Sequence, residues 1–366
     1  MAMTTLPAPA TGPHALEPTD ELFGLEELQL AGRNRGMPLE AMRYDVTPAG
    51  LHYLLIHFDI PAIDPMLWRL QLGGSVNRSR TLSLEEIRAY PRRTIPVTLE
   101  CAGNGRARLH PRPVSQPWLV EAIGTAEWTG TPLGPLLEEA GLAKDAVEVV
   151  FRGSDRGVQG GEEHDYARSL TVADAMRPEV LLAYAMNGVA LPPQHGFPLR
   201  LIVPGWYGMT SVKWLNSVEV VTDPFDGFQQ TIAYRYQRDA DDPGTPVTRM
   251  RVRALMIPPG IPDFFSRRRL VDHGRVTLAG RAWSGAGPVQ RVEVAVDGDW
   301  ASAALDPPVG DFAWRGWSFE WDACPGEHEL SVRAVDAIGD VQPLEQPWNY
   351  QGMGNNLVQQ VAVTVR

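Results

Sequence analysis

The chain has 366 residues, of which 33 are Lys or Arg and 44 are Asp or Glu, so its formal net charge is −11. This acidic balance argues against a nucleic-acid partner and against an anionic membrane partner, because both call for a basic face. With 44% hydrophobic residues the chain can bury a sizeable core, which excludes disorder over its whole length. The length favours about two domains.

The chain has two cysteines, Cys101 and Cys324, which exclude a disulfide framework and a zinc site built from several thiolates. Free thiols are typical of a reducing compartment. We expect residues 1–20 to form a flexible tail, because they are rich in Pro and lack a basic segment followed by an apolar one. The expected location is therefore cytoplasmic, or periplasmic if a signal peptide has been removed. No stretch approaches the roughly 18 apolar residues of a spanning helix, so no membrane partner is expected.

The segment 237–248 reads QRDADDPGTPVT and predicts a domain boundary. It combines an acidic run with Pro-Gly and a further Pro, which neither a buried strand nor a helix interior accommodates. We therefore expect a first domain over residues 21–240 and a second over residues 247–366.

The first domain shows mixed signals, which predict an α+β fold. Short helices are expected at Leu84–Tyr90, after the capping residue Ser83, and at Leu133–Ala140. Strands are expected at Ala146–Phe151, Leu199–Val203 and Ser217–Val221. Strands and helices do not alternate regularly, which argues against a doubly wound sheet.

The second domain shows short alternating strands, which predict an all-β immunoglobulin-like sandwich. The alternating apolar residues are Val292, Val294 and Val296 before the Asp297-Gly298 turn, then Leu330, Val332 and Ala334, and finally Val361, Val363 and Val365.

Cys101 lies where a β-branched run ends and a loop of small residues begins, in VTLECAGNGR. Gly103 and Gly105 allow a large group to approach the sulfur, and Arg106 and Arg108 favour the thiolate. The alternative is a small buried hydrophobe, which is the usual fate of a lone cysteine. Cys324, beside Pro325-Gly326, is interpreted as structural.

Two kinds of metal site remain open if Cys101 binds a metal. One is zinc with a single thiolate and scattered histidines, and the other is a metal whose remaining ligands come from an organic cofactor. Polar groups suited to such a cofactor occur in Arg33-Asn34-Arg35, in the segment His195–Arg200 and in the segment Ser211–Lys213. Each also has an ordinary explanation, as a solvated loop, a turn or a strand edge.

Three segments together resemble the sulfite oxidase family of molybdenum enzymes, and the resemblance runs from about Gly32 to the C-terminus. These segments are ECAGNGR around Cys101, Gly153-Ser154-Asp155, and VLLAYAMNGVALPPQHGFPLRLIVPGWYGMTSVKWL from Val180. The resemblance implies a molybdenum ion held by a pyranopterin in its mononucleotide-free form, with Cys101 as the protein ligand.

The same resemblance implies roles for further residues. Arg33 and Arg106 match the arginines that hold a small oxyanion substrate. The cofactor-binding pattern falls on Asn34, Arg35, Asp155, His195, Arg200, Ser211 and Lys213. The C-terminal domain matches the dimerisation domain of the family and implies a homodimer.

Three departures from the family pattern bear on the substrate. Arg35 stands where the family has a histidine. An active-site tyrosine aligns best with Phe228, with Tyr207 and Tyr234 as alternatives. A substrate-binding arginine aligns with Gln351, and the loss of one cation would weaken oxyanion binding by about 1.5–3 kcal/mol.

The resemblance makes oxidation of sulfite to sulfate the leading hypothesis for the function. The alternative is a reductase that uses the same cofactor on another oxyanion or a sulfoxide, and a third possibility is a binding protein without catalysis. The chain has no Cys-x-x-Cys-His motif, so we expect no haem and a separate electron acceptor, either a cytochrome or dioxygen.

Overall fold

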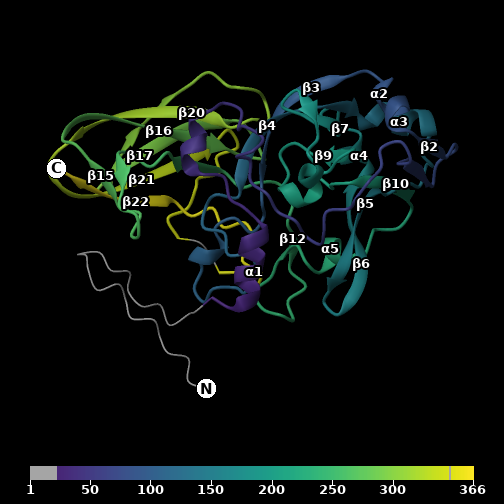
Figure 1. The fold of residues 1–366 in the computed structure, drawn as a ribbon, viewed down its shortest axis with the longest axis horizontal. Helices are drawn as coiled ribbons and strands as arrows, with labels where there is room; N and C mark the ends of the chain where they lie inside the picture. Colours follow the sequence, from purple (N-terminus) through teal and green to yellow (C-terminus); the bar gives the residue numbers. More distant parts are fainter. Residues whose placement is uncertain (1–22, 346–347) are drawn as a thin grey trace.

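The computed structural model describes residues 23–345 and 348–366, so the tail predicted at residues 1–20 lies outside the described residues. Figure 1 shows two halves side by side, with the C-terminal strands at one end and the earlier part of the chain at the other. No helix in the described part is long and apolar enough to cross a membrane.

Helices are few and short. The five α-helices of the described residues are α1 (Leu25–Arg33), α2 (Leu84–Arg88), α3 (Leu133–Ala140), α4 (Val172–Ala175) and α5 (Phe228–Thr231). The two predicted helices are confirmed as α2 and α3. Ser83 caps α2, since its Oγ accepts a hydrogen bond from the Glu86 amide at 3.2 Å. The chain is nonetheless mostly sheet, so the α+β expectation gave helices too large a share.

Two sheets form the first half of the molecule. One has the order β2-β1-β10-β5-β6, with bounds Arg80–Leu82, Leu70–Gly74, Leu215–Val221, Glu148–Gln159 and Glu162–Thr171. The other has the order β3-β4-β7-β8, with bounds Arg93–Glu100, Ile123–Pro132, Leu181–Met186 and Val189–Ala190, and β9 (Arg200–Ile202) also pairs with β7. The three predicted strands are confirmed, because each overlaps one observed strand, namely β5, β9 or β10. A two-stranded ribbon follows, made of β11 (Arg235–Tyr236) and β12 (Thr245–Pro246).

Two further sheets form the second half. The first has the order β13-β16-β20-β19, with bounds Arg253–Met256, Gly274–Trp283, Arg315–Ala323 and Ala304–Leu305. The second has the order β14-β15-β22-β21-β17-β18, with bounds Ile261–Pro262, Arg269–Val271, Gln359–Val365, Gly326–Asp336, Val289–Val296 and Asp299–Ser302. The predicted alternation is confirmed, because Val292, Leu330 and Val363 are fully buried in a shared core. Asp297 and Gly298 both have positive φ, as a two-residue hairpin turn requires.

A buried carboxylate joins the two halves. Glu100 is the last residue of β3 and is only 2% exposed. Its Oε1 accepts hydrogen bonds from Arg253 Nη1 at 2.8 Å and from Asn104 Nδ2 at 2.9 Å. Its Oε2 accepts one from Trp283 Nε1 at 2.9 Å. Because Arg253 and Trp283 belong to β13 and β16, the charge next to Cys101 is neutralised by the C-terminal half.

The loop before β22 also holds the segment that follows Glu100. The Gly354 amide donates to the Ala102 carbonyl at 2.7 Å, and Asn355 Nδ2 donates to the Gly105 carbonyl at 2.7 Å. The loop that carries Cys101 is therefore fixed from both halves of the molecule.

Replacing Arg253 by Met should destabilise the fold by about 3–5 kcal/mol, because it leaves the Glu100 carboxylate buried without its cation. Urea unfolding followed by circular dichroism measures the change. The control is Arg275→Met, which breaks an exposed ion pair with Glu320 and should leave stability unchanged. Equal effects of the two substitutions would contradict the role given to the buried pair.

Candidate active site

The Cys101 side chain lies at the junction of an inner cavity and an outer channel, and it lines both. The residue follows β3 directly, and its amide donates to the Ala122 carbonyl at 2.9 Å. A Cβ at Gly103 would lie 2.5 Å from Arg106 Nη2, so a glycine is required for the guanidinium to come this close to the loop. Burial raises the pKa of the Cys101 thiol, whereas the nearby Arg106 guanidinium lowers it.

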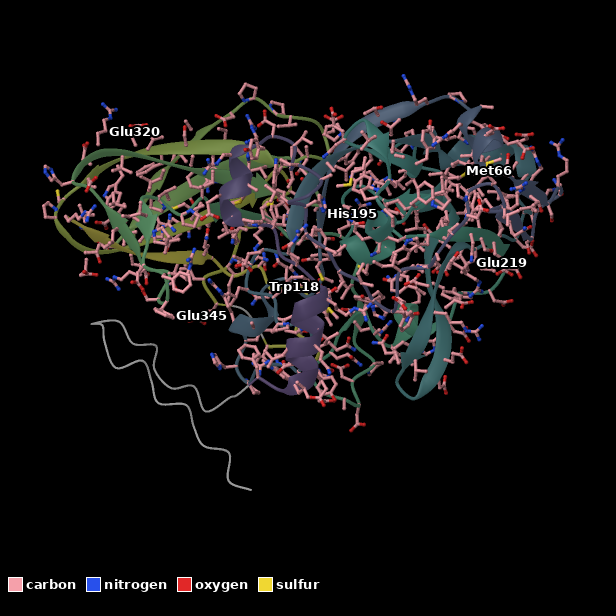
Figure 2. All side chains as sticks on the ribbon, viewed as in Figure 1. Met66, Trp118, His195, Glu219, Glu320 and Glu345 are labelled. Atoms are coloured by element: carbon pink, nitrogen blue, oxygen red, sulfur yellow. The ribbon has the colours of Figure 1, made fainter. Side chains whose placement is uncertain are left out.

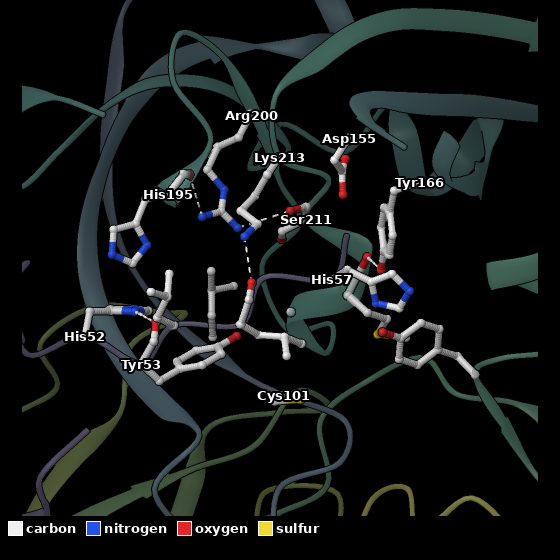
Figure 3. A pocket seen from close by; sticks show the side chains of 16 residues that line it. His52, Tyr53, His57, Cys101, Asp155, Tyr166, His195, Arg200, Ser211 and Lys213 are labelled. Atoms are coloured by element: carbon white, nitrogen blue, oxygen red, sulfur yellow. Dashed lines mark hydrogen bonds between the residues drawn. The ribbon is translucent and has the colours of Figure 1, made fainter. Parts of the chain in front are cut away.

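The inner cavity is rich in basic groups. Figure 3 shows Arg200, Ser211 and Lys213 gathered at the end opposite Cys101. Arg200 donates to the carbonyls of His195 and Ser211, at 3.0 and 3.1 Å. Lys213 Nζ donates to the Leu55 carbonyl at 2.7 Å.

These basic groups lack anionic partners in the structure. Among the described residues, neither Arg200, which is buried, nor Lys213, which is half-buried, forms an ion pair with a carboxylate; both donate to backbone carbonyls. Burial lowers the pKa of Arg200 to about 10 and also lowers that of Lys213. It lowers the pKa of His195 to about 2, which keeps this imidazole neutral. Such a cluster is suited to an anionic ligand, since buried cations are normally paired.

Asp155 gives the same cavity an acceptor. Its Oδ1 is buried and has no hydrogen-bond partner among the described residues. Burial raises the pKa of this carboxyl, and the positive charge of Lys213 opposes that rise. An orphaned carboxylate oxygen in a cavity is suited to a ligand with amide or amine groups.

The outer channel opens from Cys101 to the surface and has a volume of about 710 Å³. Among its described lining residues, Arg106 is the only one with a permanent charge. Its Nε donates to the Gln351 carbonyl at 2.9 Å and its Nη1 to the Gln116 carbonyl at 3.1 Å. Backbone carbonyls thus hold the guanidinium in place and leave its positive charge available to an anion.

None of Arg33, Asn34 and Arg35 is among the described residues that line the inner cavity. Arg33 lines neither the cavity nor the channel, because its guanidinium donates to the Phe58 carbonyl at 2.7 Å on the exposed side. Arg35 is likewise exposed and donates to the Gly50 carbonyl. Asn34 lines the channel, and its Oδ1 accepts from the Ile56 amide at 2.7 Å, so it positions the loop beside it. Arg33 therefore lies outside the lining of both spaces, and its role on the substrate side stays a prediction.

The structure places Phe228 and Tyr234, two of the residues aligned with the active-site tyrosine, at different distances from the inner cavity. Phe228 lies in the channel wall, stacked on His164 with ring centroids 4.6 Å apart. Tyr234, one of the alternatives, lines both the channel and the cavity beside Cys101. Burial raises its pKa to about 12, so its hydroxyl is protonated at neutral pH and can donate a hydrogen bond. Tyr234 therefore offers a hydroxyl at the position beside Cys101, where Phe228 has none.

The side chain of Gln351 has a structural role at the rim of the channel. Its Nε2 donates to the Ile232 carbonyl at 2.7 Å, while its backbone carbonyl accepts from Arg106. Arg106, Asp155, His195, Arg200, Ser211 and Lys213 are all brought to the cavity or the channel, as predicted.

Sequence reasoning missed His52 and His57, which line the cavity and come from the loop before β1. Figure 2 shows where this site lies in the molecule: Trp118, which lines the channel, and His195, which lines the cavity, are both near the middle. The sequence offered one signal, which is that the histidines interrupt an apolar run at residues 51–60. Burial lowers the pKa of both imidazoles, that of His52 to about 4.

Comparisons with known proteins agree with this geometry. The family model described as "Oxidoreductase molybdopterin binding domain" matches residues 57–229, and "Mo-co oxidoreductase dimerisation domain" matches residues 246–366. The chain is 35% identical over 345 residues to the mitochondrial sulfite oxidase of Homo sapiens, covering 87% of this chain and 62% of the relative. It is 35% identical over 329 residues to the sulfite oxidase of Gallus gallus, covering 84% and 71%.

A solved structure has a similar fold over most of the chain. The sulfane dehydrogenase SoxCD from Paracoccus pantotrophus superposes with a TM-score of 0.78 and 26% sequence identity, covering 90% of this chain and 86% of that chain. The chain therefore belongs to the sulfite oxidase family of molybdopterin-dependent oxidoreductases. It spans about 62% of the length of the human relative.

The residues present suit the molybdenum-pyranopterin cofactor that the family implies. The cations around Arg200 match a phosphate group, and the free Asp155 oxygen matches the amine and amide edges of a pterin. Cys101, at the other end of the cavity, supplies a single thiolate (Figure 3). The cavity thus offers a suitable group for each chemical part of the cofactor.

Lys213 should make the stability of the cofactor-free protein depend on pH. Its folded-state pKa is lowered below 10.5, so between the two values the unfolded chain binds a proton that the folded chain has released. The free energy of unfolding should therefore rise as the pH increases toward 10.5. This rise should be smaller in Lys213→Met and unchanged in Lys144→Met, which alters the other lysine of the chain. Urea unfolding at a series of pH values tests this; identical profiles for the two variants would contradict it.

Proposed function

We propose that the protein oxidises sulfite to sulfate at a molybdenum centre held by Cys101. The observation that carries this proposal is the position of the thiol, between a cavity with unpaired cations and a channel with one guanidinium. The overall reaction converts sulfite and water into sulfate, two protons and two electrons. Molybdenum, when bound, supplies the oxygen-atom transfer and accepts the two electrons.

Four residues of the inner cavity would hold the cofactor. Arg200 and Lys213 bind the phosphate by charge-assisted hydrogen bonds, and the neutral His195 adds a further polar contact. Asp155 accepts hydrogen bonds from the pterin. A single phosphate is enough to balance this cation cluster, which supports the mononucleotide-free form of the cofactor.

Two residues of the channel would act on the substrate. Arg106 attracts the oxyanion and orients it toward Cys101, because its donors are fixed by backbone carbonyls on the other side. Tyr234 donates its hydroxyl proton in a hydrogen bond to a substrate oxygen, a role supported by its raised pKa.

We propose further that the protein is a homodimer formed through residues 246–366, whose two sheets pack as an immunoglobulin-like sandwich. The match to a dimerisation domain supports the dimer, and the shared core of the two sheets supports the sandwich. A separate electron acceptor, a cytochrome or dioxygen, would reoxidise the centre without a haem in this chain. The domain boundary near residues 237–248 also stays a prediction.

Substituting Cys101 by Ser should abolish sulfite-dependent reduction of ferricyanide, because the metal loses its protein thiolate. The circular dichroism spectrum should be unchanged. Cys324→Ser is the matched control, since this thiol is exposed and lies outside both cavities, and it should retain full activity.

The same assay separates sulfite oxidation from the other hypotheses. Absence of turnover by protein with a full complement of molybdenum would refute sulfite as the substrate. Oxidation of a reduced dye by nitrate or a sulfoxide would then favour the reductase. Near-wild-type activity of Cys101→Ser would refute the ligand role of the thiol.

A further inference from the structure

The outer channel is far wider and more apolar than a four-atom anion requires. It has a volume of about 710 Å³, and more than half of its described lining residues are apolar, Leu55, Ile56, Phe58, Val114, Val158 and Ile232 among them. Val114, Val158 and Ile232 are 79%, 69% and 53% exposed, so an apolar wall extends to the surface. A fully hydrated ion gains nothing from such a wall, whereas an alkyl or aryl group does.

The charge in the channel suits a monoanion better than a dianion. Arg106 is the only permanent cation among the described lining residues, and its charge also faces the sulfur of Cys101. His57 lies at the inner end and is held neutral by burial. One guanidinium neutralises a monoanionic head group completely, whereas the second charge of a dianion such as sulfite would have to be solvated by water in the open channel.

We propose that the channel takes an organic sulfinate, R–SO2⁻, with its head group at Arg106 and its R group along the wall formed by Val114, Val158 and Ile232. The proposal rests on the function proposed above, since the reacting atom is again an oxyanion sulfur with a lone pair. Sulfinate and water give sulfonate, R–SO3⁻, with two protons and two electrons, which two equivalents of a one-electron acceptor such as ferricyanide remove. One S–O bond forms, both O–H bonds of the water break, and the C–S bond stays intact.

The apolar side chains of the wall extend along the channel, and their position determines which R groups bind best. Ile56 and Leu55 lie at the inner end, where Asn34 holds the Ile56 amide, and Ile232 lies at the rim, where Gln351 binds its carbonyl. These backbone contacts keep the apolar side chains in place. An R group longer than methyl would contact these side chains, so binding should strengthen with chain length.

The direct test is a series of linear alkanesulfonates, from methane- to pentanesulfonate, titrated into the molybdenum-loaded protein by isothermal calorimetry. Each added methylene should increase the affinity by up to about fourfold, the value for complete burial. The corresponding sulfinates, assayed with ferricyanide, should show KM values that fall in the same order. Affinity and KM that do not depend on chain length would overturn the proposal.

Two variants localise the effect. Ile232→Asn should reduce the gain in affinity per methylene for the longer sulfonates, because it places a polar amide on the wall. Ile338→Asn changes an isoleucine that is 64% exposed but lies outside the channel, and it should leave the whole series unchanged. An identical series in the two variants would contradict the assignment of the wall.

The outcome also separates this inference from the function on which it rests. Turnover of sulfite without turnover or binding of any sulfinate or sulfonate would overturn the organic substrate and leave the proposed function standing. Absence of turnover with both sulfite and sulfinates would overturn both.

Discussion

The buried carboxylate of Glu100 is the group on which the rest of the site depends. A carboxylate that is 2% exposed requires donors, and the chain supplies them from Asn104, Arg253 and Trp283. Asn104 belongs to the loop of Cys101, whereas the other two belong to the C-terminal sheet. Satisfying this one charge therefore fixes the Cys101 loop and the packing of the two halves together. The C-terminal half is thus part of the active-site scaffold as well as the matching dimerisation domain.

Charged side chains are distributed unevenly on the two sides of Cys101. The charge on each side matches that of the ligand expected there. The inner cavity holds buried cations whose pKa values are lowered by desolvation, which is unfavourable without an anionic ligand. Perturbed groups of this kind cluster at functional sites. The outer channel holds a single guanidinium and a long apolar wall. Binding a phosphate inside and a singly charged substrate outside would compensate the charges on both sides.

The site was predictable from sequence wherever a local motif carries the residue. Local sequence motifs identify the segments that contain Cys101, Arg106 and Lys213. Local rules also predict the N-cap at Ser83 and the alternating strand around Val292. The remaining features depend on contacts between distant residues. Glu100 and Arg253 are 153 positions apart, so no local pattern pairs them. The contact of Arg33 with the Phe58 carbonyl was not predictable for the same reason, since its position in the sequence carries no information on the direction of its side chain. The sequence alone favours Phe228 as the residue aligned with the active-site tyrosine. Tyr234 becomes the better candidate only because the fold brings it beside Cys101.

The central claim is that Cys101 provides the protein ligand of a molybdenum centre in the inner cavity. X-ray absorption spectroscopy at the molybdenum edge tests it directly, because the number of sulfur neighbours can be compared between the wild-type protein and Cys101→Ser. The account predicts one fewer sulfur ligand in the variant, with the loss absent from Cys324→Ser. The same number of sulfur ligands in all three proteins would contradict it.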